Sequence, residues 1–97
     1  AKAFQALRIE INQELEGLGA FIDGTVRLAA KGTRIVIISF HSLEDRIVKQ
    51  SFHALACPED GAPLLAVLTK KPVMASDTEV AANSRARSAK LRAAERV

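Results

Sequence analysis

The sequence contains neither tryptophan nor tyrosine, and four phenylalanines are its only large aromatic residues. Modules that bind single-stranded RNA unaided usually stack bases on such side chains. So few aromatic residues in a chain of 97 argue against a freestanding RNA-binding module. A chain of this length has room for one small core, or for part of a larger one.

Cysteine and long apolar runs are also scarce. Cys57 is the single cysteine, so the chain has no internal disulfide and no cysteine pair for redox chemistry. The sequence has no run of about 18 apolar residues, and neither a signal peptide nor an initiating methionine opens it. We therefore expect a cytoplasmic protein without a membrane span, and we expect the chain to be a piece of a longer protein.

Several patterns that mark active sites are missing as well. His41, His53 and Cys57 lack the spacing of a known zinc site and have no fourth ligand beside them, so we expect no metal. No glycine-rich loop follows a predicted strand, and no Ser-His-Asp or paired-carboxylate arrangement has persuasive spacing. The chain by itself therefore shows no complete active site.

Positive charge is concentrated at the C-terminal end. The net charge is only +3, but residues 83–97 contain a single acidic residue, Glu95. The basic residues in the same stretch are Arg85, Arg87, Lys90, Arg92 and Arg96. Clustered arginine and lysine suit phosphate contacts. A solvated charged surface is the commoner meaning of such a run, so charge alone indicates RNA only weakly.

Apolar residues in the first 30 positions recur at steps of three and four, which is typical of one face of an amphipathic helix. Gly17 interrupts this pattern, and glycine weakens a helix interior by about 1 kcal/mol relative to alanine. We therefore predict two consecutive helices, over residues 3–16 and 18–30. Gly32 is the expected C-cap of the second helix.

The next segments alternate between strand and helix. Residues 34–40 form a continuous apolar, β-branched run, which is typical of a parallel strand covered by helices on both faces. A helix over 43–55 follows, with Ser42 as its expected N-cap and Asp45 as the partner in a capping box. A second strand is predicted over 64–69. Together they form a βαβ unit with a right-handed crossover, so the fold class is α/β.

The last third of the chain gives weaker signals. Ser76 and Glu79 predict a second capping box, which opens a short helix over 77–82. The basic segment after it is rich in helix-forming residues, so propensity alone favours a helix. Alternation of polar and apolar residues over 90–93 gives some support to a strand instead.

Polar residues directly follow the first predicted strand, at the edge where open α/β sheets bind ligands. His41 could orient a base or move a proton, and Ser39 and Ser42 could hydrogen-bond a substrate. Alternatively, Ser42 does no more than cap the helix. Arg46 is expected to pair with a nearby carboxylate and lock the turn, although Arg46 and Lys49 together could instead meet a phosphate.

A second polar group precedes the last segment and consists of Asn83, Ser84, Arg85, Arg87 and Lys90. Amide, hydroxyl and guanidinium groups in one turn suit contacts with phosphate and ribose. The alternative is that Asn83 and Ser84 only form the turn.

Several segments resemble one known family. Residues 39–49 read SFHSLEDRIVK, residues 68–72 read LTKKP, and residues 82–92 read ANSRARSAKLR. Together with FQALRI at residues 4–9, they resemble the MraW family of S-adenosylmethionine-dependent methyltransferases, in the same order and at matching places. The resemblance covers nearly the whole chain.

The resemblance implies the C-terminal portion of a Rossmann-like methyltransferase sheet, closed by an antiparallel strand over 88–95. We expect this strand at an edge, where lysine and arginine are tolerated. The complete protein would transfer a methyl group from S-adenosylmethionine to N4 of a cytidine in 16S ribosomal RNA, without a metal. The main cofactor pocket would belong to an absent N-terminal part, so the chain alone is expected to be inactive.

Roles for individual residues are hypotheses that follow from their expected positions in this fold. We expect Ser39, His41 and Ser42 to border the substrate side of the cleft. We expect Asn83, Arg85, Arg87 and Lys90 to help hold RNA of the small ribosomal subunit. Methyl transfer would be an in-line attack of cytosine N4, to which the enzyme contributes mainly orientation and electrostatics.

Three departures from the family's pattern lie in turns or loops. Residues 31–33 replace the usual Gly-Gly, Ser84 stands where proline is common, and the loop 57–63 is short. We expect the first two to preserve function. The competing interpretation is a non-catalytic basic RNA-binding or structural domain, which requires cooperative folding and salt-sensitive RNA binding by the chain alone. A DNA cytosine methyltransferase is a distant third.

Overall fold

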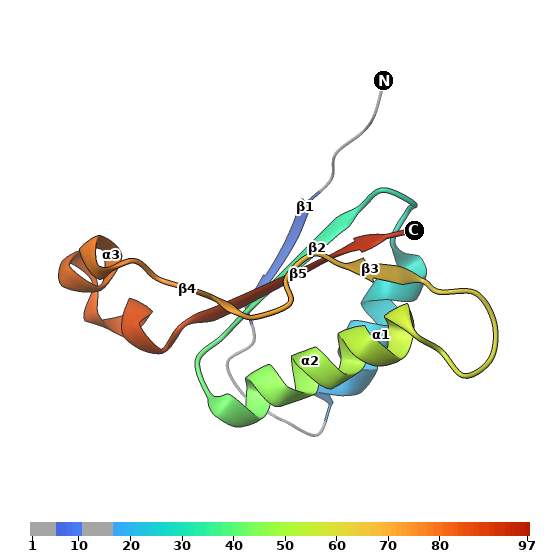
Figure 1. Cartoon of the computed structure of the whole chain (residues 1–97), viewed down its shortest axis with the longest axis horizontal. Coiled ribbons are helices and arrows are strands. Elements are labelled where there is room, and N and C mark those ends of the chain that lie inside the picture. The colour runs from blue at the N-terminus through green and yellow to red at the C-terminus, as the bar shows by residue number, and fades with distance from the viewer. Residues whose placement is uncertain (1–5, 11–16) are drawn as a thin grey trace.

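The computed structural model describes residues 6–10 and 17–97, which form a five-stranded mixed sheet with helices packed on it (Figure 1). In chain order the elements are β1 (Ala6–Glu10), α1 (Leu18–Leu28), β2 (Arg34–Ser39), α2 (Ser42–Ala56), β3 (Leu65–Val67), β4 (Val73–Met74), α3 (Asp77–Ala82), the 3-10 helix η1 (Ser84–Ser88) and β5 (Lys90–Arg96). The α/β class is as predicted. Within the described ranges, no helix is long and apolar enough to cross a membrane.

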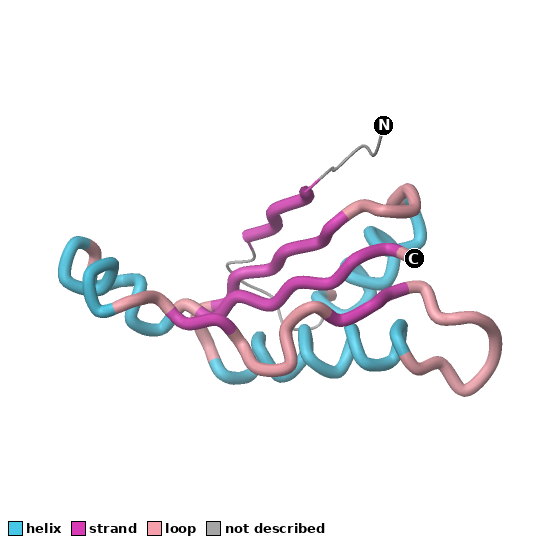
Figure 2. The backbone as a smooth tube through the Cα atoms, turned by 45° about the horizontal axis from the view of Figure 1, so that its top comes forward, coloured by secondary structure: helices cyan, strands magenta, loops and turns pink. Residues whose placement is uncertain are grey.

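The last strand in the chain, β5, lies in the middle of the sheet. The strand order is β1-β2-β5-β3, and β4 also pairs with β5 (Figure 2). β1 is parallel to β2, whereas β5 is antiparallel to β2, β3 and β4. The predicted edge position of the final strand is therefore wrong. Pairing partners of β5 are distant in sequence, so its local composition could not reveal that three strands bind it.

β2 and β3 run in the same direction, as a βαβ unit requires, but β5 separates them. Both predicted strands are shorter than expected: the segment 34–40 forms a strand to Ser39, and 64–69 forms one over Leu65–Val67. Thr69 lies beyond the end of β3. Its hydroxyl accepts a hydrogen bond from the Ala93 amide of β5 at 3.1 Å, which holds this part of the predicted strand against β5.

The core lies between the sheet and the two long helices. Its largest fully buried side chains are Ile22 and Val26 of α1, Ile35 and Ile37 of β2, and Val48 and Phe52 of α2. Their spacing of four on each helix and two on the strand places them on one face of each element. Burial of each side chain contributes about 1.5–3 kcal/mol to folding.

α1 and α2 cover the same side of the sheet (Figures 1 and 2). On β5, the alternate residues Arg92 and Ala94 are buried, whereas the alternate residues Leu91 and Ala93 are only half-buried. We predicted that helices cover both faces of the strand at 34–40. Within the described residues, α1 and α2 cover only one face. The continuous apolar run of β2 nevertheless makes both of its faces apolar, because Val36 and Ile38 lie opposite to the core residues.

The predicted helix over 3–16 is wrong at its centre, where β1 pairs in parallel with β2. The same residues satisfy a second pattern, since Leu7 and Ile9 alternate with Arg8 and Glu10 in the period of a strand. The backbone of β2 offers this segment hydrogen-bond partners that a local pattern does not contain. Residues 3–5 and 11–16 of the predicted helix lie outside the described residues.

α1 begins at Leu18, directly after the predicted break at Gly17, and its C-cap is Ala29 rather than Gly32. Gly32 serves the following turn instead. Its φ of +92° is in the region that favours glycine, and its N–H donates to the Arg96 carbonyl at 2.7 Å. The unusual sequence at 31–33 thus retains glycine at the position where the backbone requires it.

The helical core predicts a large difference between two phenylalanines. Phe52 is 2% exposed, so Phe52→Ala should lower the free energy of unfolding by about 3–5 kcal/mol, because it leaves a cavity. Phe21 is 51% exposed, and Phe21→Ala is the matched control with little expected effect. Urea unfolding followed by circular dichroism measures both. Equal losses would contradict the packing described here.

Candidate functional site

The turn between β2 and α2 is fixed by a buried carboxylate. Glu44, 2% exposed, accepts hydrogen bonds from the amides of Phe40 at 3.1 Å and His41 at 3.2 Å. His41 is the N-cap residue of α2. The cap therefore lies one residue earlier than predicted, with Glu44 in the place given to Asp45. His41 and Ser42 keep exposed side chains at the surface of this turn.

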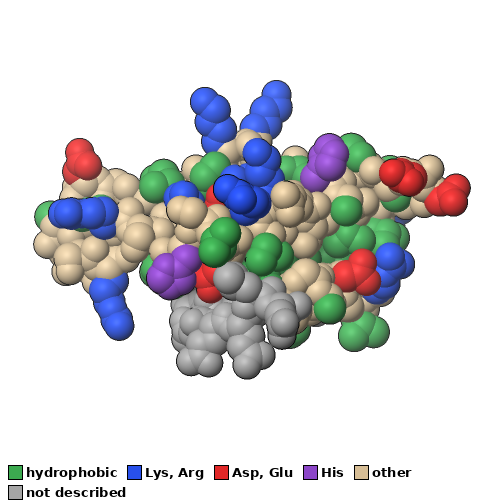
Figure 3. All heavy atoms as spheres, turned by 90° about the horizontal axis from the view of Figure 1, so that it is seen from below, with side chains coloured by type: hydrophobic (Ala, Val, Ile, Leu, Met, Phe, Trp, Pro, Cys, Tyr) green, Lys and Arg blue, Asp and Glu red, His purple; other side chains and the backbone are tan. Residues whose placement is uncertain are grey.

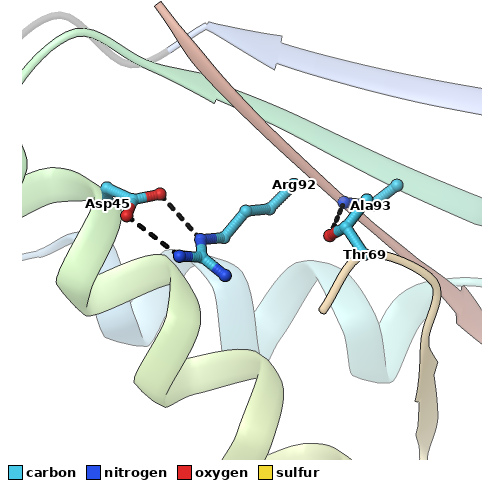
Figure 4. A network of polar contacts seen from close by, with 4 residues as sticks. All are labelled: Asp45, Thr69, Arg92 and Ala93. Atoms are coloured by element: carbon cyan, nitrogen blue, oxygen red, sulfur yellow. Dashed lines mark hydrogen bonds and ion pairs between the residues drawn. The ribbon is translucent and has the colours of Figure 1, made fainter. Parts of the chain in front are cut away.

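Asp45 has a different partner, on the middle strand of the sheet. The Arg92 guanidinium donates from Nε to Oδ1 of Asp45 at 2.7 Å and from its second terminal nitrogen to Oδ2 at 3.0 Å (Figure 4). Asp45 and Arg92 are 8% and 7% exposed. A bidentate pair of this kind is both strong and geometrically specific. It joins the first turn of α2 to β5.

The pair shifts the titration of its carboxylate. Hydrogen bonding from the Arg92 guanidinium holds the pKa of Asp45 below its usual range, although burial acts in the opposite direction. The positive charges of Arg92, Lys90 and Lys49 also lower the pKa of Asp45. Asp45 is therefore an ionised structural group and is not free to act as an acid.

Arg92 takes the role that the sequence suggested for Arg46. Arg46 is exposed, and among the described residues it forms no ion pair with a carboxylate. Arg92 seemed to be one more cation of the basic C-terminal stretch. The signal that could have identified it is its place between Leu91 and Ala93 in an alternating strand, where one of the two faces must be buried.

The structure brings together two of the predicted site segments. Ser39, 3% exposed, lies directly opposite Lys90 in the β2–β5 register. His41 and Ser42 follow Ser39 within three residues. The motif segments 39–49 and 82–92 therefore meet at the carboxyl end of β2. We call Ser39, His41, Ser42 and Lys90 the turn cluster.

A cleft of about 730 Å³ opens beside the turn cluster, and we call it the α3 cleft. Ile38 and Phe40, which flank Ser39, line it together with Met74 of β4 and Leu91 of β5. Its polar lining comes from Glu79, Asn83, Arg85 and Ser88. The α3–η1 segment that carries these polar groups extends beyond the end of the sheet (Figure 1).

Local hydrogen bonds shape the polar side of the α3 cleft. The Ser76 hydroxyl accepts from the Glu79 amide at 3.2 Å, so the predicted cap of this helix is present. Asn83 Oδ1 accepts from the Arg85 amide at 3.1 Å, which means that Asn83 does form the turn. Arg85 lines the cleft and is exposed, whereas Arg87 is exposed but does not line it.

The arrangement is suited to binding rather than to covalent chemistry. Apolar walls beside polar groups of both signs can hold a planar ring and fix its orientation. In the described part of the chain, no three His, Cys, Asp or Glu side chains are grouped so that they could hold a metal ion. Sequence reasoning missed Phe40, Met74 and Leu91, because β4 has only two residues and its pairing with β5 is non-local.

Comparison with known proteins relates the whole chain to one family. The model of the MraW methylase family matches residues 1–97. The chain is 50% identical over 107 residues to ribosomal RNA small subunit methyltransferase H of Geotalea daltonii, covering 99% of this chain and 34% of that protein. It is 55% identical over 95 residues to the protein of the same name from Nostoc, covering 98% and 29%. The chain thus spans about a third of the length of these curated relatives.

The Asp45–Arg92 pair predicts an asymmetric mutational response. Arg92→Met leaves a buried carboxylate without its partner and should cost about 3–5 kcal/mol of unfolding free energy. The double variant Asp45→Leu with Arg92→Met should recover much of that loss. Arg27→Met breaks the exposed pair with Asp23 and serves as the control, with a small expected effect. Additive losses in the double variant would contradict a coupled pair.

The lowered pKa of Asp45 also predicts a pH dependence. An unfolded aspartate titrates at about 3.9, so the stabilisation from ionised Asp45 is complete above about pH 5 and is lost as the pH falls through the lower folded value. Unfolding free energies at pH 5 to 2 should therefore fall more steeply for the parent than for Asp45→Asn. Asp60→Asn, in an exposed loop, should keep the parent's slope. Identical slopes for Asp45→Asn and the parent would refute this.

Proposed function

The chain belongs to the MraW methylase family, and on that premise we propose that it forms the C-terminal part of an S-adenosylmethionine-dependent methyltransferase acting on N4 of a cytidine in 16S ribosomal RNA. The relatives' name, ribosomal RNA small subunit methyltransferase H, supports an RNA substrate and a methyl-transfer reaction. A cytoplasmic protein that acts on the small ribosomal subunit is consistent with both.

The observation that carries the proposal is the meeting of two motif segments at one end of the sheet. Ser39 pairs with Lys90 in register, and Phe40 and Arg85 line the same cleft. The two residues of each pair are more than 40 positions apart in the chain, so their meeting is a property of the fold and not of the local sequence. In open α/β sheets, the carboxyl end of a strand is where ligands bind.

The residues divide the work of holding the substrate. His41 and Ser42 are exposed at the carboxyl end of β2 and border the cytosine base that is methylated. Asn83 and Arg85 contact ribose and phosphate at the rim of the α3 cleft, and Arg87 extends the positive surface outward. Buried Ser39 fixes the shape of the turn from beneath, beside Lys90.

These residues do not fit the cofactor itself. The amides that a strand-to-helix turn would offer to an anionic group, those of Phe40 and His41, already donate to Glu44. The Glu44 carboxylate is buried in that contact and cannot also bind a ribose. We therefore assign cofactor binding to the two thirds of the relatives that this chain does not match, and to this chain the positioning of RNA.

A second function fits part of the same observations. A non-catalytic RNA-binding domain would also use an exposed basic segment at Arg85 and Arg87, and it needs no cofactor pocket. The two proposals differ in what the chain does when it is joined to an N-terminal part. The methyltransferase proposal requires activity in the joined protein and none in the chain alone.

Methyl transfer to small ribosomal subunits tests the proposal directly. The chain alone should give no product from labelled S-adenosylmethionine, whereas the chain joined to the N-terminal part of the Nostoc relative should methylate cytidine N4. Nucleoside analysis by mass spectrometry identifies the modified atom. A folded joined protein that methylates no cytidine would disprove the proposal and favour the RNA-binding function.

Variants of the joined protein test the residue roles. Arg85→Gln with Arg87→Gln should raise the KM for subunits about tenfold with little change in kcat, because charge-assisted contacts to phosphate are lost. His41→Ala should lower kcat instead. Arg27→Gln removes a cation of α1 that does not line the cleft, and it serves as the control. Unchanged kinetics in both the double arginine variant and His41→Ala would refute the assigned roles.

A further inference from the structure

We infer that a second basic groove, on the helical side of the sheet, holds the phosphodiester backbone of RNA; the identity of the polyanion rests on the proposed function. The groove runs between α2 and the β3–β4 connection and has a volume of about 720 Å³. Lys49 and His53 of α2 line one side and Lys70 lines the other. We call it the lysine groove.

The charge of the lysine groove has one sign. Lys49 and Lys70 are exposed, and neither forms an ion pair with a carboxylate of residues 17–97. No aspartate or glutamate among residues 17–97 lines the groove, and exposed Lys71 adds a further positive charge next to Lys70. Figure 3 shows lysine and arginine side chains gathered over the middle of this side of the molecule.

The Asp45–Arg92 pair leaves this positive charge available. Arg92 also lines the groove, but both oxygens of Asp45 already accept hydrogen bonds from its guanidinium. Lys49 is close enough to lower the pKa of Asp45, yet Asp45 is neutralised by Arg92 and does not hold the lysine. The free cations of the groove are therefore flexible ammonium groups, which bind phosphates as point charges.

The chemistry of the groove favours an RNA backbone over an acidic protein segment. Between the lysines the floor is apolar, with buried Phe52 and Leu65 and partly exposed Val67. Cations on both sides of this floor suit a strand whose negative charges repeat at every nucleotide, whereas the charges of an acidic peptide depend on its sequence.

The lysine groove and the α3 cleft lie on opposite faces of β5. Leu91 lines the cleft and Arg92 lines the groove, and neighbouring residues on a strand point to opposite faces. Lys90 begins β5 opposite Ser39, between Ala89 and Leu91 of the cleft lining. An RNA strand that enters the cleft at Arg85 can therefore pass around the carboxyl end of β2, by Lys90, and reach Lys49 and Lys70.

Salt dependence of RNA binding separates this site from simple net charge. We would measure the affinity of the joined protein for a fluorescein-labelled single-stranded RNA of mixed sequence at several salt concentrations. Lys49→Gln with Lys70→Gln should reduce the slope of log K against log salt by roughly 1.4, since each lost phosphate contact removes about 0.7. Arg27→Gln with Lys31→Gln removes the same charge elsewhere and should leave most of the slope unchanged.

Each other outcome overturns the inference. Equal slopes for the two double variants would show that net charge, and not the groove, attracts RNA. No binding by the joined protein without substitutions, or competition by polyglutamate as strong as that by unlabelled RNA, would exclude a site for RNA backbone. Methyl transfer by the joined protein is scored separately, so activity with an unchanged slope rejects the groove and leaves the proposed function intact.

Discussion

The buried ion pair between Asp45 and Arg92 is the contact on which the candidate site depends. It fixes the first turn of α2 against the strand at the centre of the sheet, 47 positions away in the chain. Glu44, one residue earlier, closes the preceding turn by accepting two backbone hydrogen bonds. Two neighbouring carboxylates thus fix the turn: Asp45 binds Arg92 of the sheet, and Glu44 binds the backbone amides of Phe40 and His41.

Burying this pair carries a desolvation cost that only good geometry offsets. The two short hydrogen bonds supply that geometry, and the lowered pKa of Asp45 is their electrostatic consequence. The same neutralisation separates the functional surfaces. Because Arg92 is paired with Asp45, the exposed cations that line the lysine groove are Lys49 and Lys70, while exposed Arg85 lines the α3 cleft.

Local patterns predicted the elements whose stabilising contacts are close in sequence. The four-residue spacing of Ile22 and Val26, and the cap formed by Ser76 and Glu79, are readable in a few consecutive residues. β1 could not be predicted in this way, because Leu7 fits both a helical and a strand pattern and pairing with β2 decides between them.

The candidate site shows the same division. The rule that ligands bind at the carboxyl ends of strands predicted Ser39, His41 and Ser42 as site residues without any structure. The pairing of Ser39 with Lys90 and the walls formed by Phe40 and Met74 depend on β5 lying between β2 and β3. That arrangement brings together segments from both halves of the chain, and the role of Arg92 could not be separated from that of its basic neighbours before it was known.

The central claim is that the two motif segments form one surface for RNA at the carboxyl end of β2. Ultraviolet crosslinking of the joined protein to a ribosomal RNA fragment, followed by mass spectrometry of the crosslinked peptides, tests it most directly. The account predicts crosslinks in residues 39–42 and 83–90 of the same complex. Crosslinks confined to the loop at 57–63 or to α1, with neither motif segment modified, would contradict it.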